Sequence, residues 1–181
     1  MPTNDETVSD ARRPLWGLGR RRAQQEAVPA GPQVEVLGAP VDGTAIPLAE
    51  VEDPAFSTGL VGPGAAVRPA SGLVVAPVAG TVLTAMPHAY GLRTASGVEV
   101  LVHVGIDTVS LGGRHFEPVV TAGQQVAAGD PLVRVDLAAV ADEGCPTTVV
   151  VVVTNAAGLG GVQPHDPGPV AAGGPILTVQ V

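Results

Sequence analysis

The chain has 181 residues, enough for one domain with its own core, and a formal net charge of −8, which argues against a nucleic-acid partner. Hydrophobic residues make up 45% of it but aromatic residues only 2%, so the core must consist of small and β-branched side chains, which favour β-sheets. A single cysteine excludes an internal disulfide. With a polar, acidic start and no apolar run long enough to span a bilayer, this predicts a cytoplasmic protein.

Residues 1–32 differ in composition from the rest of the chain. They hold five of the nine basic residues, lack regular periodicity and end in Pro29-Ala30-Gly31-Pro32. We therefore expect a flexible N-terminal tail over residues 1–32 and a folded domain over residues 33–181. The segment Leu15-Trp16-Gly17-Leu18 lies between arginine clusters, so contact of the tail with an anionic membrane surface is the alternative to plain disorder.

From residue 34 onward, short apolar runs rich in β-branched residues alternate with glycine and proline, of which the whole chain has 24 and 18. This pattern predicts an all-β fold, an antiparallel β-sandwich or barrel with Gly/Pro-rich turns and at most short helical turns. The expected strands cover residues 34–37, 45–48, 65–68, 73–76, 80–85, 92–94, 98–104, 119–126, 132–136, 147–154 and 176–181, and the expected helical turn covers residues 137–142.

The strand over residues 98–104 carries a histidine in an otherwise apolar run. Alternation places the valines at 98, 100, 102 and 104 on one face, which we assign to the core, and Glu99, Leu101 and His103 on the other. Asp107 has the same parity, but in an extended strand it would lie roughly 13 Å from His103. Gly105 allows a bend that would bring the two closer.

A second histidine, His88, precedes this strand by one short strand and a turn, so a hairpin can place it beside His103. Two imidazoles on one face can act as nucleophile and phosphoryl stabiliser, or as two metal ligands. The other candidates for chemistry are weaker. His115 and His165 lie in Gly/Pro-rich loops, and Cys145 has the setting of a structural residue.

The two histidines and their flanks resemble a known family, the glucose-type enzyme IIA (EIIA) of the bacterial phosphoenolpyruvate-dependent sugar phosphotransferase system. The resemblance covers roughly residues 34–181. It rests on residues 75–81 (VAPVAGT), 88–90 (HAY), 96–99 (SGVE), 101–109 (LVHVGIDTV), 116, 123–126 (GQQV), 129–130, 136–137 and 151–155 (VVVTN).

This resemblance implies a phosphocarrier that accepts a phosphoryl group from the carrier protein HPr on His103. It passes the group to a cysteine of enzyme IIB (EIIB), so that a sugar is taken up and phosphorylated. It further implies that His88 stabilises the phosphoryl group and that the docking face includes Asp107, Asp53, Phe56 and Leu101. The implied partners are HPr and the EIIB/IIC sugar permease, with regulated enzymes or transporters as further candidates.

The sequence departs from the family pattern at a few positions near the site. Met86 stands where the family usually has a polar residue, often threonine, that helps hydrogen-bond the active site. Pro87 is unusual beside the first histidine, Leu101 replaces a phenylalanine, and His115 replaces a glycine. Neither Met86 nor Asp107 is therefore a secure partner for orienting the ring of His103.

Several alternatives compete with the carrier interpretation. His103 and Asp107 form H-x-x-x-D, which resembles the metal motif of LytM-like zinc peptidases, but the required downstream H-x-H is missing. No cofactor is required for phosphoryl transfer; His88 and His103 are also the candidate ligands of a regulatory zinc, with a further ligand from a partner protein. A biotinyl or lipoyl carrier is excluded because the chain has no lysine. A regulatory binding module that is never phosphorylated stays open.

Overall fold

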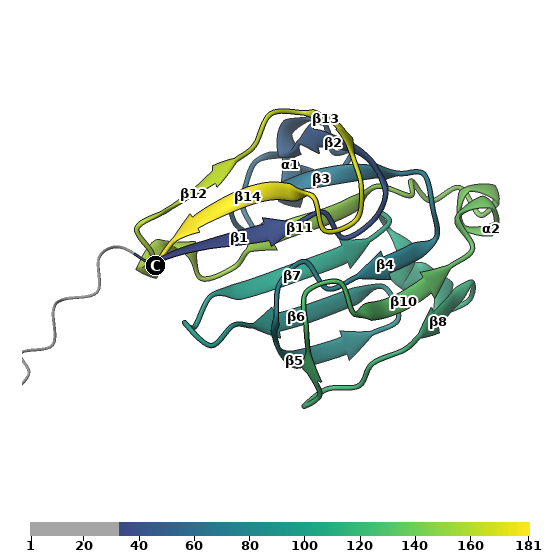
Figure 1. The fold of residues 1–181 in the computed structure, drawn as a ribbon. Coiled ribbons are helices and arrows are strands. Elements are labelled where there is room, and N and C mark those ends of the chain that lie inside the picture. The colour runs from purple at the N-terminus through teal and green to yellow at the C-terminus, as the bar shows by residue number, and fades with distance from the viewer. Residues whose placement is uncertain (1–32) are drawn as a thin grey trace, which may run out of the picture. The chain divides into compact units, whose positions relative to one another are not determined.

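Most of the regular elements in the computed structural model, which describes residues 33–181, are β-strands (Figure 1). The strands are β1 Val34–Gly38, β2 Gly43–Pro47, β3 Gly64–Pro69, β4 Leu73–Val75, β5 Gly80–Met86, β6 Ala89–Arg93, β7 Glu99–Val104, β8 Phe116–Pro118, β9 Gln125–Val126, β10 Pro131–Val135, β11 Val149–Val153, β12 Gly161–Pro164, β13 Gly168–Val170 and β14 Pro175–Gln180. The predicted flexible tail and its membrane contact lie outside the described residues.

Helical structure is confined to segments of three to six residues. The α-helices are α1 Pro54–Ser57 and α2 Leu137–Asp142, and 3₁₀ turns cover Leu48–Glu50 (η1), Thr108–Leu111 (η2) and Ala156–Gly158 (η3). Within residues 33–181, none of the helices has the length and apolar character needed to cross a membrane.

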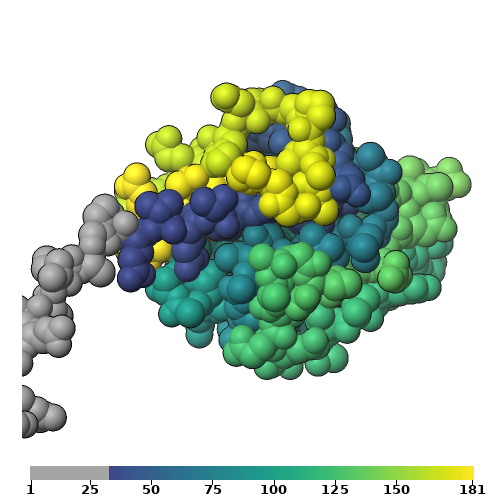
Figure 2. Space-filling model, viewed as in Figure 1, coloured from purple at the N-terminus to yellow at the C-terminus, as the bar shows by residue number. Residues whose placement is uncertain are grey.

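The strands form one large sheet and two small ones, with antiparallel pairing. The large sheet has the order β13-β2-β3-β11-β7-β6-β5-β9, and the small sheets have the orders β1-β14-β12 and β4-β10-β8. The small sheets lie across the large one in Figure 1, and β1 and the C-terminal strand lie side by side at the surface in Figure 2. The fold class predicted from the sequence is confirmed.

The main core lies between the large sheet and the two small sheets. It collects the alternate residues of β7, namely Val100, Val102 and Val104, with residues of β14 and β10 such as Leu177 and Leu132. Most of these side chains are aliphatic, as the low aromatic content required, although Tyr90 is fully buried among them. Strand β11 is buried along its whole length, as predicted for a central strand.

A smaller apolar cluster covers part of the opposite face of the large sheet. Ile46, Ala66, Val150 and Val152 of β2, β3 and β11 pack there against Val51, Phe56 and Ile106, which lie in segments outside the strands. This cluster forms because η1, α1 and the turn after β7 fold over the outer face of the sheet. The outer face, on which the sequence places His103, is therefore partly covered.

The structure differs from the expected elements where the sequence pattern for a strand or a helix is weak. No strand was expected between residues 154 and 176, yet this segment contains β12 and β13, which are short strands at sheet edges. Helix α1 was not predicted, because four residues carry no helical periodicity. In the segment 119–126, the turn that the sequence indicates at Ala122-Gly123 is present, but the strand is reduced to β9, and Phe116–Pro118 forms β8.

Candidate functional site

His103 lies near the end of β7 on the outer face of the large sheet. The burial of β7 alternates, with the valines buried and Glu99, Leu101 and His103 half-buried, so the predicted parity is confirmed. The register pairs His103 with Val150 of β11 on one side and with Ala89 of β6 on the other. The ring therefore stands at the border between the covered part of this face and its open part.

The ring of His103 is oriented by the backbone just beyond its own strand. Its Nδ1 lies 2.8 Å from the carbonyl oxygen of Gly105. A carbonyl oxygen only accepts hydrogen bonds, so Nδ1 must carry the proton and donate it. In the neutral ring the lone pair is then on Nε2, which is the arrangement that a nucleophilic imidazole needs.

Gly105 makes this contact because the chain turns sharply there. Its φ is +75°, a conformation that glycine adopts without strain. A Cβ at this position would lie 2.4 Å from Cγ2 of Thr108 and 3.0 Å from the carbonyl oxygen of Pro146. The sequence suggested Gly105 only as a bend, whereas in the structure its carbonyl holds the ring. The sequence could show only that residue 105 is a glycine, which permits a positive φ. No sequence motif indicates that its carbonyl contacts a side chain.

His88 comes from the turn between β5 and β6 and is buried. Its carbonyl accepts a hydrogen bond from the Val104 N–H at 2.8 Å, which ties this turn to the end of β7. The hydroxyl of the buried Tyr90 donates to the Pro87 carbonyl at 3.3 Å and holds the turn from the core side. The rings of His88 and His103 meet edge to face, with centroids 5.4 Å apart, so the predicted pairing of the two histidines is found.

Helix α1 brings an aromatic ring to the other side of His103. Asp53 caps this helix, because its carboxylate accepts a hydrogen bond from the Ala55 N–H at the helix start, and Pro54 follows it at the first helical position. One turn later, the buried ring of Phe56 lies with its centroid 5.2 Å from that of His103. Both Asp53 and Phe56 were predicted from the resemblance to belong to the site.

The surroundings of the two histidines favour their neutral forms. Burial lowers the pKa of His103 below its ordinary value of 6.5, the Gly105 hydrogen bond opposes this shift, and His88 adds to it. The carboxylates of Asp53 and Asp107 raise the pKa of His103 more weakly. Burial also lowers the pKa of His88. A neutral His103 near pH 7 has its Nε2 lone pair free.

Asp107 and Leu101 occupy different positions in the site. Asp107 is exposed and has a φ of +58°, at the start of η2, and its charge reaches His103 without providing the orienting hydrogen bond. Leu101 is half-buried on the His103 side of β7 and packs against the cluster that contains Phe56. The doubt about an orienting partner is therefore answered by Gly105 rather than by Asp107 or Met86.

Three exposed apolar side chains close in sequence to segments of this site were not predicted to belong to it. Leu60 follows α1, Val109 follows Asp107, and Met86 precedes His88, with exposures of 82%, 67% and 45%. Met86 pairs with Ala89, and Ala89 pairs with His103, so Met86, Ala89 and His103 share one face of the sheet. Two strand spacings separate Met86 from His103, roughly 10 Å. From the sequence, Met86 was considered only as the loss of a polar residue and not as an exposed apolar side chain.

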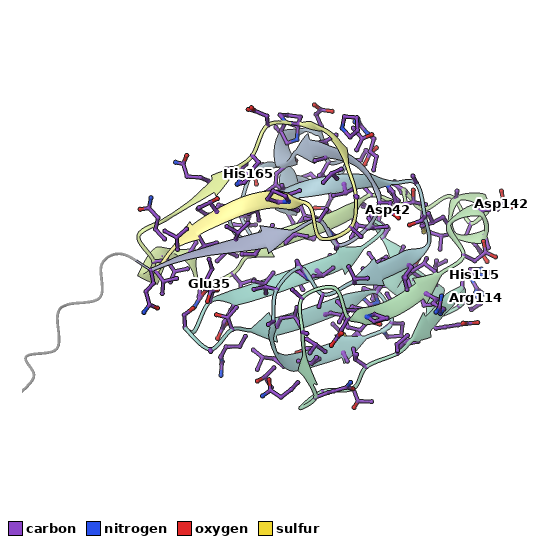
Figure 3. All side chains as sticks on the ribbon, in the orientation of Figure 1. Glu35, Asp42, Arg114, His115, Asp142 and His165 are labelled. Atoms are coloured by element: carbon purple, nitrogen blue, oxygen red, sulfur yellow. The ribbon has the colours of Figure 1, made fainter. Side chains whose placement is uncertain are left out.

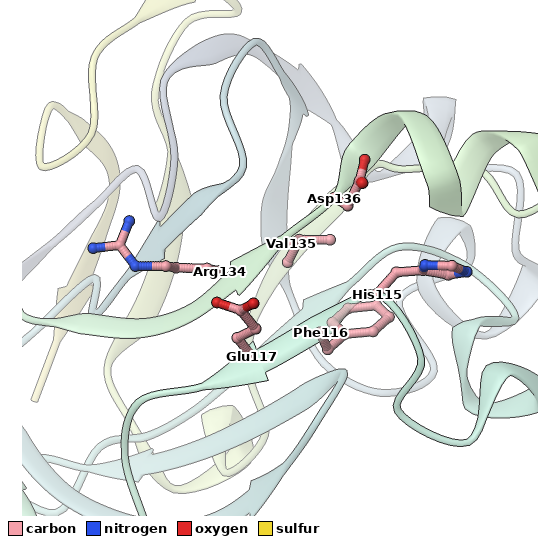
Figure 4. Close-up of a pocket in the computed structure, with 6 residues that line it drawn as sticks. All are labelled: His115, Phe116, Glu117, Arg134, Val135 and Asp136. Carbon is pink, nitrogen blue, oxygen red and sulfur yellow. The ribbon is translucent and has the colours of Figure 1, made fainter.

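The remaining histidines lie elsewhere in the described residues. His115 contacts Glu143 at 3.3 Å near α2, and His165 contacts the Thr178 hydroxyl at 2.8 Å beside β14 (Figure 3). A groove of about 520 Å³ between β8 and β10 contains His115 with Arg134 and Glu117, but neither histidine of the pair (Figure 4). Cys145 is buried in the main core.

His88 and His103 alone do not provide enough ligands for a metal site. Within residues 33–181, no three His, Cys, Asp or Glu side chains are grouped so that they could hold a metal ion. His103 has only Nε2 free, since Nδ1 is bound to Gly105. His88 and His103 could therefore supply two nitrogen ligands, and a second molecule would have to supply the others.

Residues 35–159 match the model of the family described as phosphoenolpyruvate-dependent sugar phosphotransferase system, EIIA 1. This chain belongs to that EIIA family. Family membership agrees with the geometry, because the matched range contains both histidines and every residue assigned to their surroundings. EIIA proteins are phosphotransferase components of sugar transport.

Two similar EIIA proteins are single components named as glucose-specific. The one from Mycoplasma capricolum is 49% identical over 66% of this chain and 79% of its own length. The one from Halalkalibacterium halodurans is 42% identical over 78% of this chain and 81% of its own length. The solved structure of glucose permease IIA from Mycoplasma capricolum matches with a TM-score of 0.76 and 42% identity, over 81% of this chain and 96% of that one.

Other relatives carry the EIIA region within longer proteins. The glucose-specific EIICBA component of Streptococcus pneumoniae is 43% identical over 88% of this chain. The chain spans about a fifth of the length of this relative and of the similar EIIBCA component of Corynebacterium glutamicum. In these proteins the EIIA region is joined to EIIB and EIIC regions, as their names state.

Proposed function

We propose that this EIIA chain is a cytoplasmic phosphocarrier, which accepts a phosphoryl group from phospho-HPr on Nε2 of His103 and passes it to a cysteine of EIIB. The observation that carries the proposal is the Nδ1–H bond from His103 to the Gly105 carbonyl. It fixes the tautomer and leaves Nε2 as the nucleophile beside a second imidazole.

In the first step, the Nε2 lone pair of His103 attacks the phosphorus of phospho-HPr. An N–P bond forms on His103, the N–P bond on HPr breaks, and the HPr histidine recovers its electron pair. Positive charge develops on the acceptor ring as the bond forms. The Gly105 carbonyl, which accepts a hydrogen bond from Nδ1–H, stabilises this charge throughout.

In the second step, a cysteine thiolate of EIIB attacks the same phosphorus, and the electron pair of the broken N–P bond returns to Nε2. A loose phosphoryl transition state needs alignment and hydrogen-bond donors around its oxygens more than it needs further chemistry. We assign to His88 the donation of an N–H to a phosphoryl oxygen. Its edge-to-face contact with His103 supports this assignment.

The charges around the site support partners with basic surfaces. The charges that act on His103 come from His88, Asp53 and Asp107, none of which is an arginine. Arg68, Arg93 and Arg114 each pair with a glutamate instead. HPr and EIIB would therefore bring the positive charge that the phosphoryl group requires, and the exposed Asp107 would meet it. The fusions with EIIB and EIIC support EIIB as the acceptor.

The docking face that we assign combines Asp53, Phe56, Leu101 and Asp107 with the exposed apolar side chains near them. It suits partners that bind in turn, since a single apolar face around one nucleophile can serve donor and acceptor alike. Further regulated enzymes or transporters could use this same face. The regulatory zinc remains a secondary proposal and depends on additional ligands from such a partner.

The test is phosphorylation with phosphoenolpyruvate, enzyme I and HPr, followed by mass spectrometry of the intact chain. The wild-type chain should gain about 80 Da, one phosphoryl group, and His103→Ala should gain none. His88→Gln should still gain the group but pass it to EIIB far more slowly. The control His165→Ala, which changes a histidine remote from the site, should behave as wild type.

Two outcomes would contradict this proposal. An unmodified wild-type chain would favour the regulatory module that is never phosphorylated. A gain of mass that persists in His103→Ala would place the phosphoryl group on another residue. The LytM-like peptidase is the weaker alternative, because family membership and the missing third metal ligand both disfavour it.

A further inference from the structure

The Gly105 carbonyl that orients His103 is held in place by a segment forty residues away. The peptide unit between Gly105 and Ile106 carries that carbonyl and also the Ile106 N–H, which donates to the Pro146 carbonyl at 2.8 Å. The C=O and N–H of a trans peptide point in opposite directions, so the bond to Pro146 directs the Gly105 carbonyl toward His103. The Gly105 N–H donates to the Thr148 carbonyl at 3.0 Å and fixes the preceding peptide.

Thr108 closes the same turn from inside. Its side chain is fully buried (0% exposed), and its hydroxyl donates to the Val104 carbonyl at 2.8 Å. Its methyl group occupies the space beside Gly105, since a Cβ at Gly105 would lie 2.4 Å from that methyl carbon. One side chain therefore contacts both the end of β7 and the residue whose carbonyl holds the His103 ring.

Thr108 does more than fill space in the core. A buried hydroxyl that bonds a carbonyl four residues earlier closes the turn 104–108 at a fixed size. Within that turn, Gly105 and Asp107 both have positive φ values, +75° and +58°. This conformation costs a non-glycine residue free energy, although less for Asp than for most, and constraints from the surroundings help to hold it. The Thr108 hydrogen bond is one such constraint.

We propose that Thr108 is a positioning residue for phosphoryl acceptance, because its hydroxyl holds the turn in which the Gly105 carbonyl faces Nδ1 of His103. Through this turn it keeps the proton on Nδ1 and the lone pair on Nε2. The kinetic consequence rests on the proposed function, whereas the effect on the tautomer does not.

The test compares Thr108→Val, which replaces the hydroxyl by a methyl group, with Thr108→Ser, which keeps the hydroxyl. Imidazole ¹⁵N spectra of the labelled protein above pH 7 report the tautomer of His103. Wild type and Thr108→Ser should show the Nδ1–H form, and Thr108→Val should show a mixture of the two tautomers. In the phosphorylation assay, kcat should fall about tenfold to a hundredfold in Thr108→Val. The KM for HPr should hold, because the docking face is unchanged.

Thr94→Val is the matched control. Thr94 is also buried and its oxygen accepts a hydrogen bond from the Val98 N–H, but it lies in the turn before β7, at the other end from His103. Its loss should lower stability without changing the tautomer or kcat. If Thr108→Val does not fold, Thr108→Ala removes the same hydroxyl without adding an atom.

A wild-type tautomer and kcat in a folded hydroxyl-free variant would overturn the proposal, as would a serine variant that behaves like the valine one. A wild-type spectrum with the proton on Nε2 would overturn it as well. If the tautomer responds as expected while the wild-type chain accepts no phosphoryl group, the proposed function fails and the positioning role stands.

Discussion

At the scale of single residues, His103 combines a fixed tautomer with a tendency to remain neutral. The Gly105 carbonyl decides which nitrogen is protonated, and burial decides at what pH the second proton binds. The two effects act together, because only the neutral ring with a free Nε2 can attack phosphorus. Phe56 and His88 confine the ring on two sides and leave little freedom for it to turn away.

The lowered pKa of His103 predicts how phosphoryl acceptance depends on pH. We expect the rate from phospho-HPr to stay near its plateau down to pH values below 6.5 and to fall only as the ring is protonated. The measurement is the acceptance rate against pH, beside an NMR titration of the ring. A midpoint at or above 6.5 in that titration would contradict the expectation, and the NMR midpoint separates His103 from ionisations on HPr.

The same shift affects stability. Between pH 6.5 and the lower pKa of the folded state, the unfolded chain binds a proton that the folded ring does not bind. The free energy of unfolding should therefore fall as the pH falls through this window. His88, whose pKa is also lowered by burial, acts in the same direction.

At the scale of elements, α1 is a four-residue helix whose position depends on its cap. Asp53 accepts from the Ala55 N–H at 2.6 Å, and Phe56 then packs on His103. So short a helix has little stability of its own, so the cap and the burial of Phe56 must hold it together. The element supplies both a contact and a charge to the site.

Two substitutions separate these roles of Asp53. Asp53→Ala removes cap and charge and should cost about 1 kcal/mol of the free energy of unfolding. Asp53→Asn removes the charge but keeps a capping oxygen, so its stability should stay near wild type. In both variants the pKa of His103 should fall further, because the Asp53 carboxylate raises it.

Chemical denaturation and the NMR titration of His103 measure the two effects. Equal losses of stability in both variants would show that the cap is not what Asp53 contributes. An unchanged pKa in Asp53→Asn would show that its charge does not reach the ring. Glu117→Gln, which removes a carboxylate beside Arg134 in the β8–β10 groove, is a suitable control for a general change of charge.

At the scale of the whole molecule, residues 33–181 carry four arginines against thirteen carboxylates and no lysine. A surface of this charge attracts basic partners over distances set by the salt concentration, with a Debye length of about 8 Å at physiological ionic strength. The exposed Asp107 places part of that charge beside His103. The charge is therefore suited to accelerating association with the proposed basic partners rather than to the chemical step.

We expect the association rate with phospho-HPr to fall steeply as salt increases, while single-turnover transfer within the complex changes little. Stopped-flow measurement of transfer at several salt concentrations gives both rates. Asp107→Asn should weaken the salt dependence of association. An association rate that does not depend on salt would mean that the net charge serves only to keep the chain dispersed.

The sequence by itself determined the fold class and the side of the sheet on which His103 lies. Both follow from local rules: valines at every second position of a strand must share one face, so His103 must occupy the other. The hairpin between His88 and His103 was short enough for their pairing to be inferred. The match of their flanks to EIIA was specific enough to name the family and to include Asp53 and Phe56.

Only the tertiary structure decided what orients His103 and what surrounds it. The Gly105 carbonyl faces Nδ1 because Pro146 and Thr148, distant in sequence, bind the neighbouring N–H groups. The contact of Phe56 likewise depends on η1 and α1 folding over β2, β3 and β11. Residue types predict which face a side chain occupies, but the direction of a backbone carbonyl depends on φ, ψ and long-range pairing, which no local pattern encodes.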